Sequence, residues 1–481
     1  MENNGLLDIF RELYPNKKRF SWRQFGGFKR ARLDFFLISS TLLPFIENTD
    51  ILPGIASDHS IASLDIDFSK FKRGKGFFKF NNSLLKDTEY IKLVNDVIRD
   101  VSALYAEDIY DPNFLKLATP EQQQSLIFTI NPQLLLEALL LEIRGKTIGY
   151  CAWKKKCANA AQSLALHRLE QVEIASDKQP SCLDLKRELD LARDEVDRFN
   201  EKEAEAAECR ARIRWRIHGE KPSKFFSNLE KYNALQKYIP ELKVKDNDGV
   251  EFVINEQKEI DNELYKYYQT LYRSQEANLK TLTIANFIDE PNFTYPKLSE
   301  TQASRLEGLL SLKEATDYMK SCRSDASPGS SGFSGGFYKM FWRNLKHFIL
   351  NSLNFAYESG NLSVSQKLGI IILLPKPDKD KKLLTNWRPI SLLNHVYKIL
   401  SGALAERIKP ILPCIIHGDQ KGFVSGRYIG ECIRNTYDVI EYAKNNNRSG
   451  LILCIDFEKA FDSISHSFII KTLHFFGFGH S

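Results

Sequence analysis

A short apolar run near the carboxyl end of the chain, LILCID (Leu451–Asp456), constrains the fold more than any other stretch. Its length and its leucine and isoleucine content are typical of a β-strand covered on both faces, which requires neighbouring strands and covering helices. Asp456 would stand at the carboxyl end of this strand. A carboxylate there is costly unless it is paired or holds a cation. It is therefore either an aspartate that accepts from N–H groups at a helix terminus, or a metal ligand.

The rest of the carboxyl-terminal segment alternates strands and helices. A strand is predicted over Leu368–Lys376, helices over 394–409 and 429–444, and a further helix after Ser465, which would cap it. Between Ile239 and Pro296 the pattern indicates a hairpin around KDNDGVEF and another helix. The predicted fold class is therefore α+β.

The middle of the chain, from about Asn81 to Lys237, has a helical and strongly charged pattern. Within it, Leu183–Trp215 places apolar residues at helical spacing, and we interpret it as an exposed helix with one packed face rather than a coiled coil with a partner. The amino-terminal segment is strand-like instead, with short runs at Arg32–Ser39 and Ser60–Phe68.

Composition restricts the class of protein. The net charge of +6 is only mildly basic, so the clustering of charge is more informative than its total. The eight cysteines contain no C-x-x-C pair, so neither a zinc site nor a disulfide framework is indicated. No apolar run reaches the length of a membrane span, and we predict an intracellular protein of the cytoplasm or nucleus. Two basic clusters, Pro15–Arg32 and Arg210–Phe226, interleave cations with aromatic residues, as nucleic-acid contacts require, although an ordinary basic helix end explains the second equally well.

A lysine-rich loop joins a predicted strand to NWRPISLLN within Leu373–Asn394. Lys376 at the strand end and Arg388, which lies between a tryptophan and a proline, are well placed to hold a triphosphate, since arginine offers a bidentate fork and lysine a point charge. The other loop lysines are expected to be solvated; they are Lys379, Lys381 and Lys382.

Three ordered blocks resemble successive early blocks of the reverse transcriptases of non-LTR (LINE-like) retrotransposons. They are LPKPDKDKKLLTNWRPISLLN, DQKGFVSGRYI (Asp419–Ile429) and IDFEKAFDSI (Ile455–Ile464). RSDASPGSSGFSGGFYKMFW resembles the preceding block, although Ala326, Ser330 and Ser331 depart from the usual Lys-Ser-Pro-Gly-Pro-Asp-Gly form, as in an altered copy. GEKPSKFFSNLEK (Gly219–Lys231) resembles the linker between endonuclease and polymerase in this family.

The resemblance implies a right-hand polymerase, with fingers and the start of the palm in residues 298–481. Asp456 would be the first metal-binding carboxylate, and the backbone carbonyl of Phe457 would hold the same Mg²⁺ or Mn²⁺ ion. Phe461 would stack under the incoming sugar, whereas Asp462 would be structural. Lys376 and Arg388 would hold the triphosphate. The residues implied to line the template and nucleotide path are Gln420, Gly422 and Phe423.

The family's remaining carboxylates form an aromatic-x-Asp-Asp hairpin tens of residues after the first. None of the residues after Asp462 is an aspartate or a glutamate. A two-metal site needs more than one carboxylate. We therefore expect a truncated polymerase that is inactive alone.

The amino-terminal segment Phe20–Asp67 resembles the carboxyl-terminal end of an apurinic-type endonuclease. The resemblance implies that His59 acts on the attacking water or the scissile phosphate, that Asp34 orients it, and that Asp58 serves the metal site. Only the end of that domain is present, so residues 1–68 are expected to be a β-sandwich remnant that does not cut DNA. Residues 69–297 would then be a mainly helical linker.

Three functional hypotheses follow. The first is an RNA-directed DNA polymerase that uses an RNA template, a DNA primer or target and dNTPs, works as a cytoplasmic or nuclear ribonucleoprotein, and needs neither a membrane nor a small-molecule cofactor. The second is a non-catalytic RNA- or DNA-binding remnant of such an element, whose binding would be salt-sensitive and independent of Asp456. The third is a nuclease, which the missing amino-terminal ligands argue against.

Overall fold

The computed structural model describes residues 6–23, 29–52, 59–67, 77–178, 182–211, 239–245, 248–273, 294–457 and 459–479. These residues form both helices and strands, in agreement with the predicted mixed class. They belong to two compact units, Met1–Phe77 and Phe78–Ser481. Within the ranges above, no helix combines the length and the apolar character that crossing a membrane requires.

The first unit is built from short antiparallel strand pairs. The pairs are β1 (Leu6–Asp8) with β4 (Leu37–Ser39), β2 (Trp22–Arg23) with β3 (Arg30–Ala31), and β5 (Ile46–Leu52) with β6 (Ile61–Ile66). A short helix, α1 (Ile9–Leu13), buries Ile9 and Phe10. The strand predicted at Ser60–Phe68 is confirmed as β6, whereas only the last residues of Arg32–Ser39 form a strand.

The second unit has a helical core. It is formed by α2 (Thr88–Tyr105), the first part of α5 (Pro132–Lys178), α10 (Leu312–Ser321), α11 (Gly335–Met340), α12 (Trp342–Ser359) and α14 (His395–Ile408). Helix α2 begins where the Asp87 carboxylate accepts from the backbone N–H groups of Glu89 and Tyr90, and its buried valines and isoleucine recur at helical spacing. Helices from 78–178 and from 312–408 therefore share one core.

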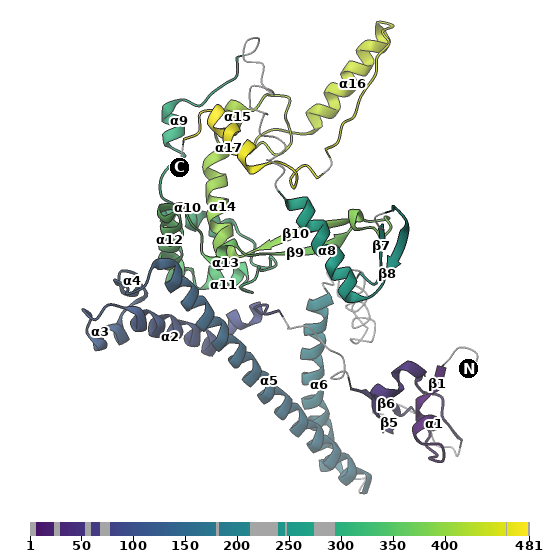
Figure 1. Cartoon of the computed structure of the whole chain (residues 1–481). Helices are drawn as coiled ribbons and strands as arrows, with labels where there is room; N and C mark the ends of the chain where they lie inside the picture. Colours follow the sequence, from purple (N-terminus) through teal and green to yellow (C-terminus); the bar gives the residue numbers. More distant parts are fainter. Residues whose placement is uncertain are drawn as a thin grey trace. The chain divides into compact units, whose positions relative to one another are not determined.

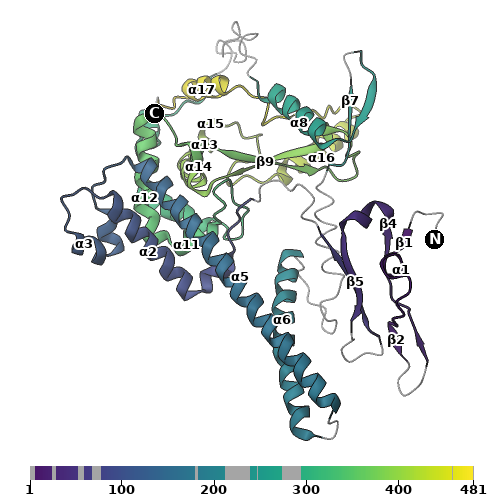
Figure 2. The same cartoon turned by 60° about the horizontal axis from the view of Figure 1, so that its bottom comes forward.

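Helices α5 and α6 (Leu183–Ala211) lie side by side as an antiparallel pair (Figures 1 and 2). Their contact is a small cluster in which Ala165 and Leu169 of α5 meet Ala192 and Val196 of α6. The predicted single packed face of α6 is confirmed in its described part, and the residues after Ala211 lie outside the described ranges.

Two hairpins and a helix pack around a buried tryptophan. The hairpins are β7 (Leu242–Lys245) with β8 (Glu251–Ile254), and β9 (Gly369–Pro375) with β10 (Trp387–Leu393). Trp387 is buried together with Leu242 and with Ile260 of α8 (Gln257–Tyr272). These elements confirm the predicted hairpin around KDNDGVEF, the helix that follows it and the strand at 368–376.

The carboxyl-terminal part contains α15 (Leu412–Ile415), α16 (Gly430–Asn445) and α17 (His466–Phe475). The remaining short elements of the unit are the 3₁₀ turns Asn82–Lys86 and Leu384–Asn386, α3 (Pro112–Leu117), α4 (Pro120–Gln124), α9 (Glu300–Ser304) and α13 (Val364–Lys367). Helices α14 and α16 confirm their predictions to within one residue at each end. Ser465 does occupy the N-cap of α17, but its hydroxyl hydrogen-bonds Ser467 Oγ at 2.9 Å and does not cap the helix.

The prediction of a covered strand at Leu451–Ile455 is wrong for this structure. The segment has no regular secondary structure and Leu451 is 91% exposed. A strand needs a neighbour for its backbone hydrogen bonds. None of the strand pairs in the described residues includes this segment, so its apolar side chains have no sheet to cover them.

Candidate reverse transcriptase site

The β9–β10 hairpin places two predicted phosphate ligands on one face. Arg388 lies directly opposite Leu374 in the antiparallel register, and the N–H of Lys376 donates to the Asn386 carbonyl at 2.8 Å. This bond continues the pairing one residue beyond the end of β9, so Lys376 is the diagonal neighbour of Arg388. Trp387 points to the opposite face, where it is buried. The hairpin therefore presents both cations together.

The loop between these strands is fixed by its own polar groups. Trp387 Nε1 donates to the Lys381 carbonyl at 2.8 Å. Lys382 pairs with Glu241 at 2.8 Å, which raises the pKa of the lysine. Asp380 accepts from the Lys382 N–H at 3.0 Å and from Lys243 Nζ at 3.0 Å, and both interactions lower the pKa of Asp380. The expectation that Lys382 is merely solvated is thus wrong, because the lysine ties the loop to the β7–β8 region.

Within the described ranges, neither Lys376 nor Arg388 forms an ion pair. Arg388 is exposed and Lys376 is half-buried. Two cations on one face with no carboxylate partner leave a positively charged surface that favours an anionic ligand.

The second predicted block forms a loop organised by one arginine. The Arg427 guanidinium donates to the carbonyls of Pro413, Ile416, His417 and Gln420, at 3.3, 2.8, 2.6 and 2.8 Å. Inside the loop, Gln420 Nε2 donates to the Gly422 carbonyl at 3.1 Å.

The next residue of this loop, Phe423, has a φ of +63° and a side chain that is 94% exposed. A positive φ is strained for an aromatic residue, so the surrounding hydrogen bonds hold a backbone that would otherwise relax.

The third block meets the second through two exposed aromatic rings. Phe461 is 86% exposed, and its ring lies edge-on to the Phe423 ring with centroids 6.1 Å apart. Asp456 and Phe457 precede it in an exposed segment. Asp462 accepts from the Tyr272 hydroxyl at 3.4 Å, consistent with the structural role expected for it. Two of the predicted site residues, from blocks far apart in the sequence, are thus in contact.

Other predicted residues are not brought together. Among the described residues, no hydrogen bond or ion pair joins the β9–β10 hairpin to Asp456. In the same residues, no group of three or more histidine, cysteine, aspartate or glutamate side chains could hold a metal ion. In the described part of the chain, Asp456 is therefore not a member of a three-residue cluster of this kind.

In the first unit, His59 Nδ1 lies 2.7 Å from Asp34 Oδ2, so two of the three residues expected from the endonuclease resemblance are paired. Ser21 fixes this arrangement, since its buried hydroxyl accepts from the N–H groups of Leu33 and Asp34 at 2.9 and 2.8 Å. The third residue, Asp58, lies outside the described ranges.

Several cations of the first basic cluster lie close to carboxylates of the same unit. Arg32 is paired with Asp8, which raises the pKa of the guanidinium and lowers that of the carboxyl. Lys17 and Arg19 lie 3.6 and 3.7 Å from Asp50. Nearly all of the second basic cluster lies outside the described ranges.

Sequence reasoning missed one buried residue, Asn394, the last of NWRPISLLN. Its side-chain oxygen accepts from the Ser331 N–H at 2.9 Å, and its nitrogen donates to Ser330 Oγ at 2.9 Å and to the Ser365 carbonyl at 2.6 Å. Residue 329 next to it must be a glycine, because a Cβ at this position would lie 2.5 Å from the backbone nitrogen of Asn394. An asparagine between an apolar strand and a helix was the available signal. The glycine-rich segment is therefore a packed turn.

Comparison with known proteins identifies the family of these blocks. Residues 374–481 match the reverse transcriptase (RNA-dependent DNA polymerase) family. The chain is 27% identical over 477 residues, 99% of its length, to the transposon TX1 uncharacterized 149 kDa protein of Xenopus laevis, of which it covers 34%. It is 31% identical over 107 residues to the retrovirus-related Pol polyprotein from type-1 retrotransposable element R2 of Popillia japonica, covering 22% of this chain and 14% of that protein.

A third relative is the probable RNA-directed DNA polymerase from transposon X-element of Drosophila melanogaster, 32% identical over 102 residues, or 21% of this chain and 11% of that protein. The chain thus spans about a third of the transposon TX1 protein and smaller shares of the other two. The residues matched by the family include the end of β9, all of β10, the Phe423 loop and Asp456. Residues 374–481 thus match the reverse transcriptase family, and the chain is similar to proteins of transposons and retrotransposable elements.

Proposed function

We propose that the chain contributes to an RNA-directed DNA polymerase that copies an RNA template from a DNA primer or target, with dNTPs as substrates. Residues 298–481 would form its fingers and the start of its palm. The observation that carries this proposal is the contact between Phe423 and Phe461, because it joins two blocks of the reverse transcriptase resemblance on one exposed surface. Phe461 then lies under the incoming sugar, and Gln420, Gly422 and Phe423 line the template and nucleotide path.

Lys376 and Arg388 hold the triphosphate in this proposal. Their shared face and their lack of ion pairs among the described residues support it. Arg388 supplies a planar fork for two phosphate oxygens, and Lys376 adds a compact charge beside it.

The oxygens of Asp456 and of the Phe457 carbonyl would hold the metal ion, Mg²⁺ or Mn²⁺. The donors fit such an ion, since Mg²⁺ is commonly bound by one or two carboxylates, waters and substrate phosphates, and both residues are exposed. When bound, the ion stabilises charge on the attacking and leaving oxygens. The chain's own contribution is to present the Asp456 carboxylate and the Phe457 carbonyl in an exposed segment of the same block as Phe461.

A second candidate function is nucleic-acid binding without catalysis. The observation that favours it is that, among the described residues, Asp456 belongs to no group of three or more histidine, cysteine, aspartate or glutamate side chains that could hold a metal ion. We therefore expect this 481-residue polypeptide, by itself, to bind nucleic acid and not to extend a primer. In the cell we propose that it acts as a ribonucleoprotein in the cytoplasm, the nucleus or both.

Primer extension on an oligo(dT)-primed RNA, with Mg²⁺ or Mn²⁺, separates the two functions. Extension by the unaltered chain that is lost in Asp456→Asn would show a complete metal site. Salt-dependent RNA binding without extension, unchanged in Asp456→Asn, would establish the non-catalytic function. Absence of both extension and RNA binding would contradict both candidates.

Binding of dTTP in the presence of Mg²⁺ tests the triphosphate ligands. We expect Lys376→Gln and Arg388→Gln each to weaken binding by about 10- to 150-fold, because each loses a charge-assisted hydrogen bond worth about 1.5–3 kcal/mol. Lys379→Gln, in the same loop, is the matched control and should leave binding unchanged. If all three substitutions weakened dTTP binding equally, the hairpin would contribute only its overall positive charge, and Lys376 and Arg388 would not be specific triphosphate ligands.

For the first unit we propose an endonuclease-like arrangement in which Asp34 orients His59 and Asp58 serves the metal. The 2.7 Å contact between His59 and Asp34 supports the first part. An NMR titration of His59 in the full chain tests it. An Asp34→Asn substitution that leaves the His59 titration unchanged would contradict the pairing.

A further inference from the structure

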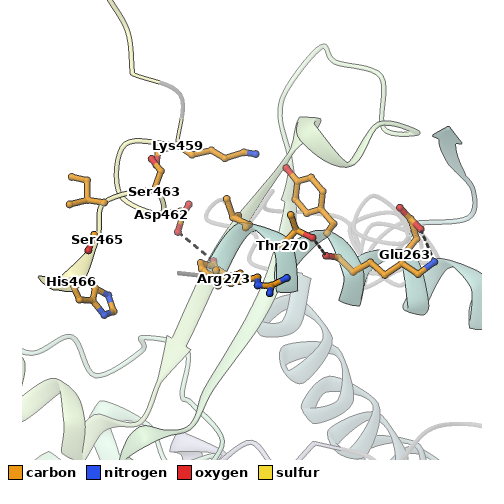
Figure 3. Close-up of a pocket in the computed structure, with 13 residues that line it drawn as sticks. Glu263, Thr270, Arg273, Lys459, Asp462, Ser463, Ser465 and His466 are labelled. Carbon is orange, nitrogen blue, oxygen red and sulfur yellow. Dashed lines mark hydrogen bonds and ion pairs between the residues drawn. The ribbon is translucent and has the colours of Figure 1, made fainter. Parts of the chain in front are cut away.

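A pocket of about 860 Å³ lies between α8 and residues 459–466 (Figure 3). One wall is the carboxyl-terminal half of α8, which was not singled out as functional and lies outside the matched family region. The other wall begins shortly after Asp456 and continues to His466 at the start of α17. The pocket therefore joins a helix of the middle segment to the segment that carries the proposed metal ligand.

Aromatic side chains line the α8 wall. Tyr267 lies under Lys459, whose Nζ is 5.0 Å from the ring centroid. Tyr272 donates from its hydroxyl to Asp462 Oδ1 at 3.4 Å. Burial, followed by the nearby Asp462 carboxylate, raises the pKa of Tyr272, so its hydroxyl stays a neutral hydrogen-bond donor at physiological pH. The rings therefore offer apolar faces beside a lysine.

The charge of the lining is positive on balance. It contains Lys266, Arg273 and Lys459 against Glu263 and Asp462. Both carboxylates have partners in the walls, since Glu263 lies 3.8 Å from Lys266 and Asp462 accepts from Tyr272.

Arg273, the C-cap residue of α8, is exposed and forms no ion pair with the part of the chain that the structure describes. An anion in the pocket would meet this guanidinium without displacing a carboxylate.

Hydroxyl groups complete the lining, from Thr270, Ser463 and Ser465. Cations interleaved with aromatic rings and hydroxyls are the side chains that sites for single-stranded nucleic acid use, because every base has a face that can stack and every phosphate carries a charge. The volume is also near the upper end of the range for small-molecule pockets. These features favour a strand over a free nucleotide.

We propose that this pocket binds a single-stranded segment of nucleic acid, with a base against Tyr267 or Tyr272 and phosphates at Arg273 and Lys459. The proposal deepens the proposed function and rests on it, because it gives the nucleic acid a second contact beyond the Asp456 surface. Phe461, in the proposed nucleotide path, directly precedes Asp462 of the pocket wall, so a strand that passes Phe461 reaches the pocket within one residue of chain.

Fluorescence anisotropy with the full chain tests the proposal, using a labelled 20-nucleotide single-stranded RNA and a DNA of the same sequence. Tyr267→Leu and Tyr272→Leu should each weaken binding by about 5- to 150-fold, the loss of one stacked base. The double variant Arg273→Gln with Lys459→Gln should reduce the salt slope by about 1.4, since each phosphate contact to a single strand contributes about 0.7.

Two matched controls are Tyr357→Leu on α12 and Lys313→Gln on α10, both exposed and outside the pocket, and neither should alter binding. Equal losses for RNA and DNA, or a loss for one of them only, would support the pocket and identify its strand. Unchanged affinity in all the pocket variants would overturn it while leaving the proposed function intact. No binding of either oligonucleotide by the unaltered chain would overturn both.

A crosslinking experiment keeps the proposal testable where a variant fails to fold. The unaltered chain, irradiated with an RNA that contains 4-thiouridine, should crosslink within residues 263–273 or 459–466. Crosslinks that map only elsewhere would overturn the assignment. If excess dTTP removed these crosslinks, the pocket would be a site for a free nucleotide, and the proposal that it binds a single strand would be wrong.

Discussion

The helical core and the surface around Asp456 use aromatic side chains in opposite ways. Phe333 and Phe337 stack with ring centroids 4.2 Å apart, and Phe337 is 0% exposed. Phe423 and Phe461 also contact each other, but both are almost fully exposed. Burial of the first pair stabilises the fold. The second pair is exposed, so it adds little to stability, and its rings remain accessible to a ligand. Stability and ligand contact are thus separated within one unit.

Arginines differ in a similar way between the helical core and the β9–β10 hairpin. The Arg407 side chain is 11% exposed, is paired with Glu314, and donates to the carbonyls of Gly308 and Leu309 at 2.9 and 2.7 Å. Arg388 is exposed on its hairpin. A buried and fully bonded guanidinium cannot bind a ligand without unfolding its surroundings, so substitutions in the two regions should have different consequences.

The largest contrast is expected between Phe337→Ala and Phe461→Ala. The first leaves a cavity in the core and should lower the free energy of unfolding by about 3–5 kcal/mol. The second removes an exposed ring and should change it by less than about 0.5 kcal/mol, while weakening nucleotide binding. Urea denaturation and dTTP binding measure the two effects. A comparable loss of stability in both variants would mean that the Phe423–Phe461 contact is part of the core.

Arg407→Met should be the next most destabilising change. It removes the partner of Glu314, whose pKa Arg407 lowers to about 2, and leaves several backbone carbonyls without their donor. We expect the free energy of unfolding to fall by about 3 kcal/mol, since removing one partner of a buried pair costs roughly that much. Lys313→Gln, an exposed neighbour of Glu314 in sequence, is the control for urea denaturation. A decrease in the free energy of unfolding of less than about 1 kcal/mol would show that Arg407 does not stabilise the helical core.

The core should also carry a pH dependence, centred on a buried histidine. Burial, and secondarily the nearby Lys398, lowers the pKa of His395 to about 4 from 6.5. The unfolded chain therefore binds a proton that the folded chain does not, and the free energy of unfolding should fall, by at most about 3 kcal/mol, as the pH drops from 6.5 toward 4. Above pH 6.5 this contribution is constant.

His395→Gln should flatten this dependence, measured by urea denaturation at a series of pH values. Glu314 does not interfere above pH 4.5, because its lowered pKa affects stability only below that value. An unchanged slope between pH 4.5 and 6.5 in the variant would assign the dependence to another group.

Much of the fold follows from local patterns in the sequence. Helices α14 and α16, the β7–β8 hairpin and strand β9 have clear periodicity or turn residues, which depend on neighbours in the chain. Helical spacing also identified the face of α6 that packs on α5. These features were predictable because each element specifies its own geometry.

The remainder depends on contacts between distant segments. An apolar run such as Leu451–Ile455 indicates a strand but does not specify a neighbour, and its exposure here has no signal in the run itself. The resemblance grouped Phe423 with Phe461 as site residues, but not as rings in contact. The α8 pocket was missed because Tyr267 and Tyr272 resemble ordinary core residues at helical spacing. Their position opposite residues 459–466 depends on the packing of segments almost two hundred residues apart.

The smallest expected effect is that of Tyr272→Phe. This change keeps the ring and removes only the 3.4 Å hydrogen bond to Asp462, which lies near the limit for such bonds and at an exposed position. We expect the free energy of unfolding, measured in urea, to change by less than about 0.5 kcal/mol. A loss above about 1 kcal/mol would mean that the hydroxyl holds residues 459–466 against α8. Residues 459–466 would then be held in place by a polar contact, as the helical core is by Arg407. In that case the segment that follows Asp456 would contribute to stability as well as to ligand binding.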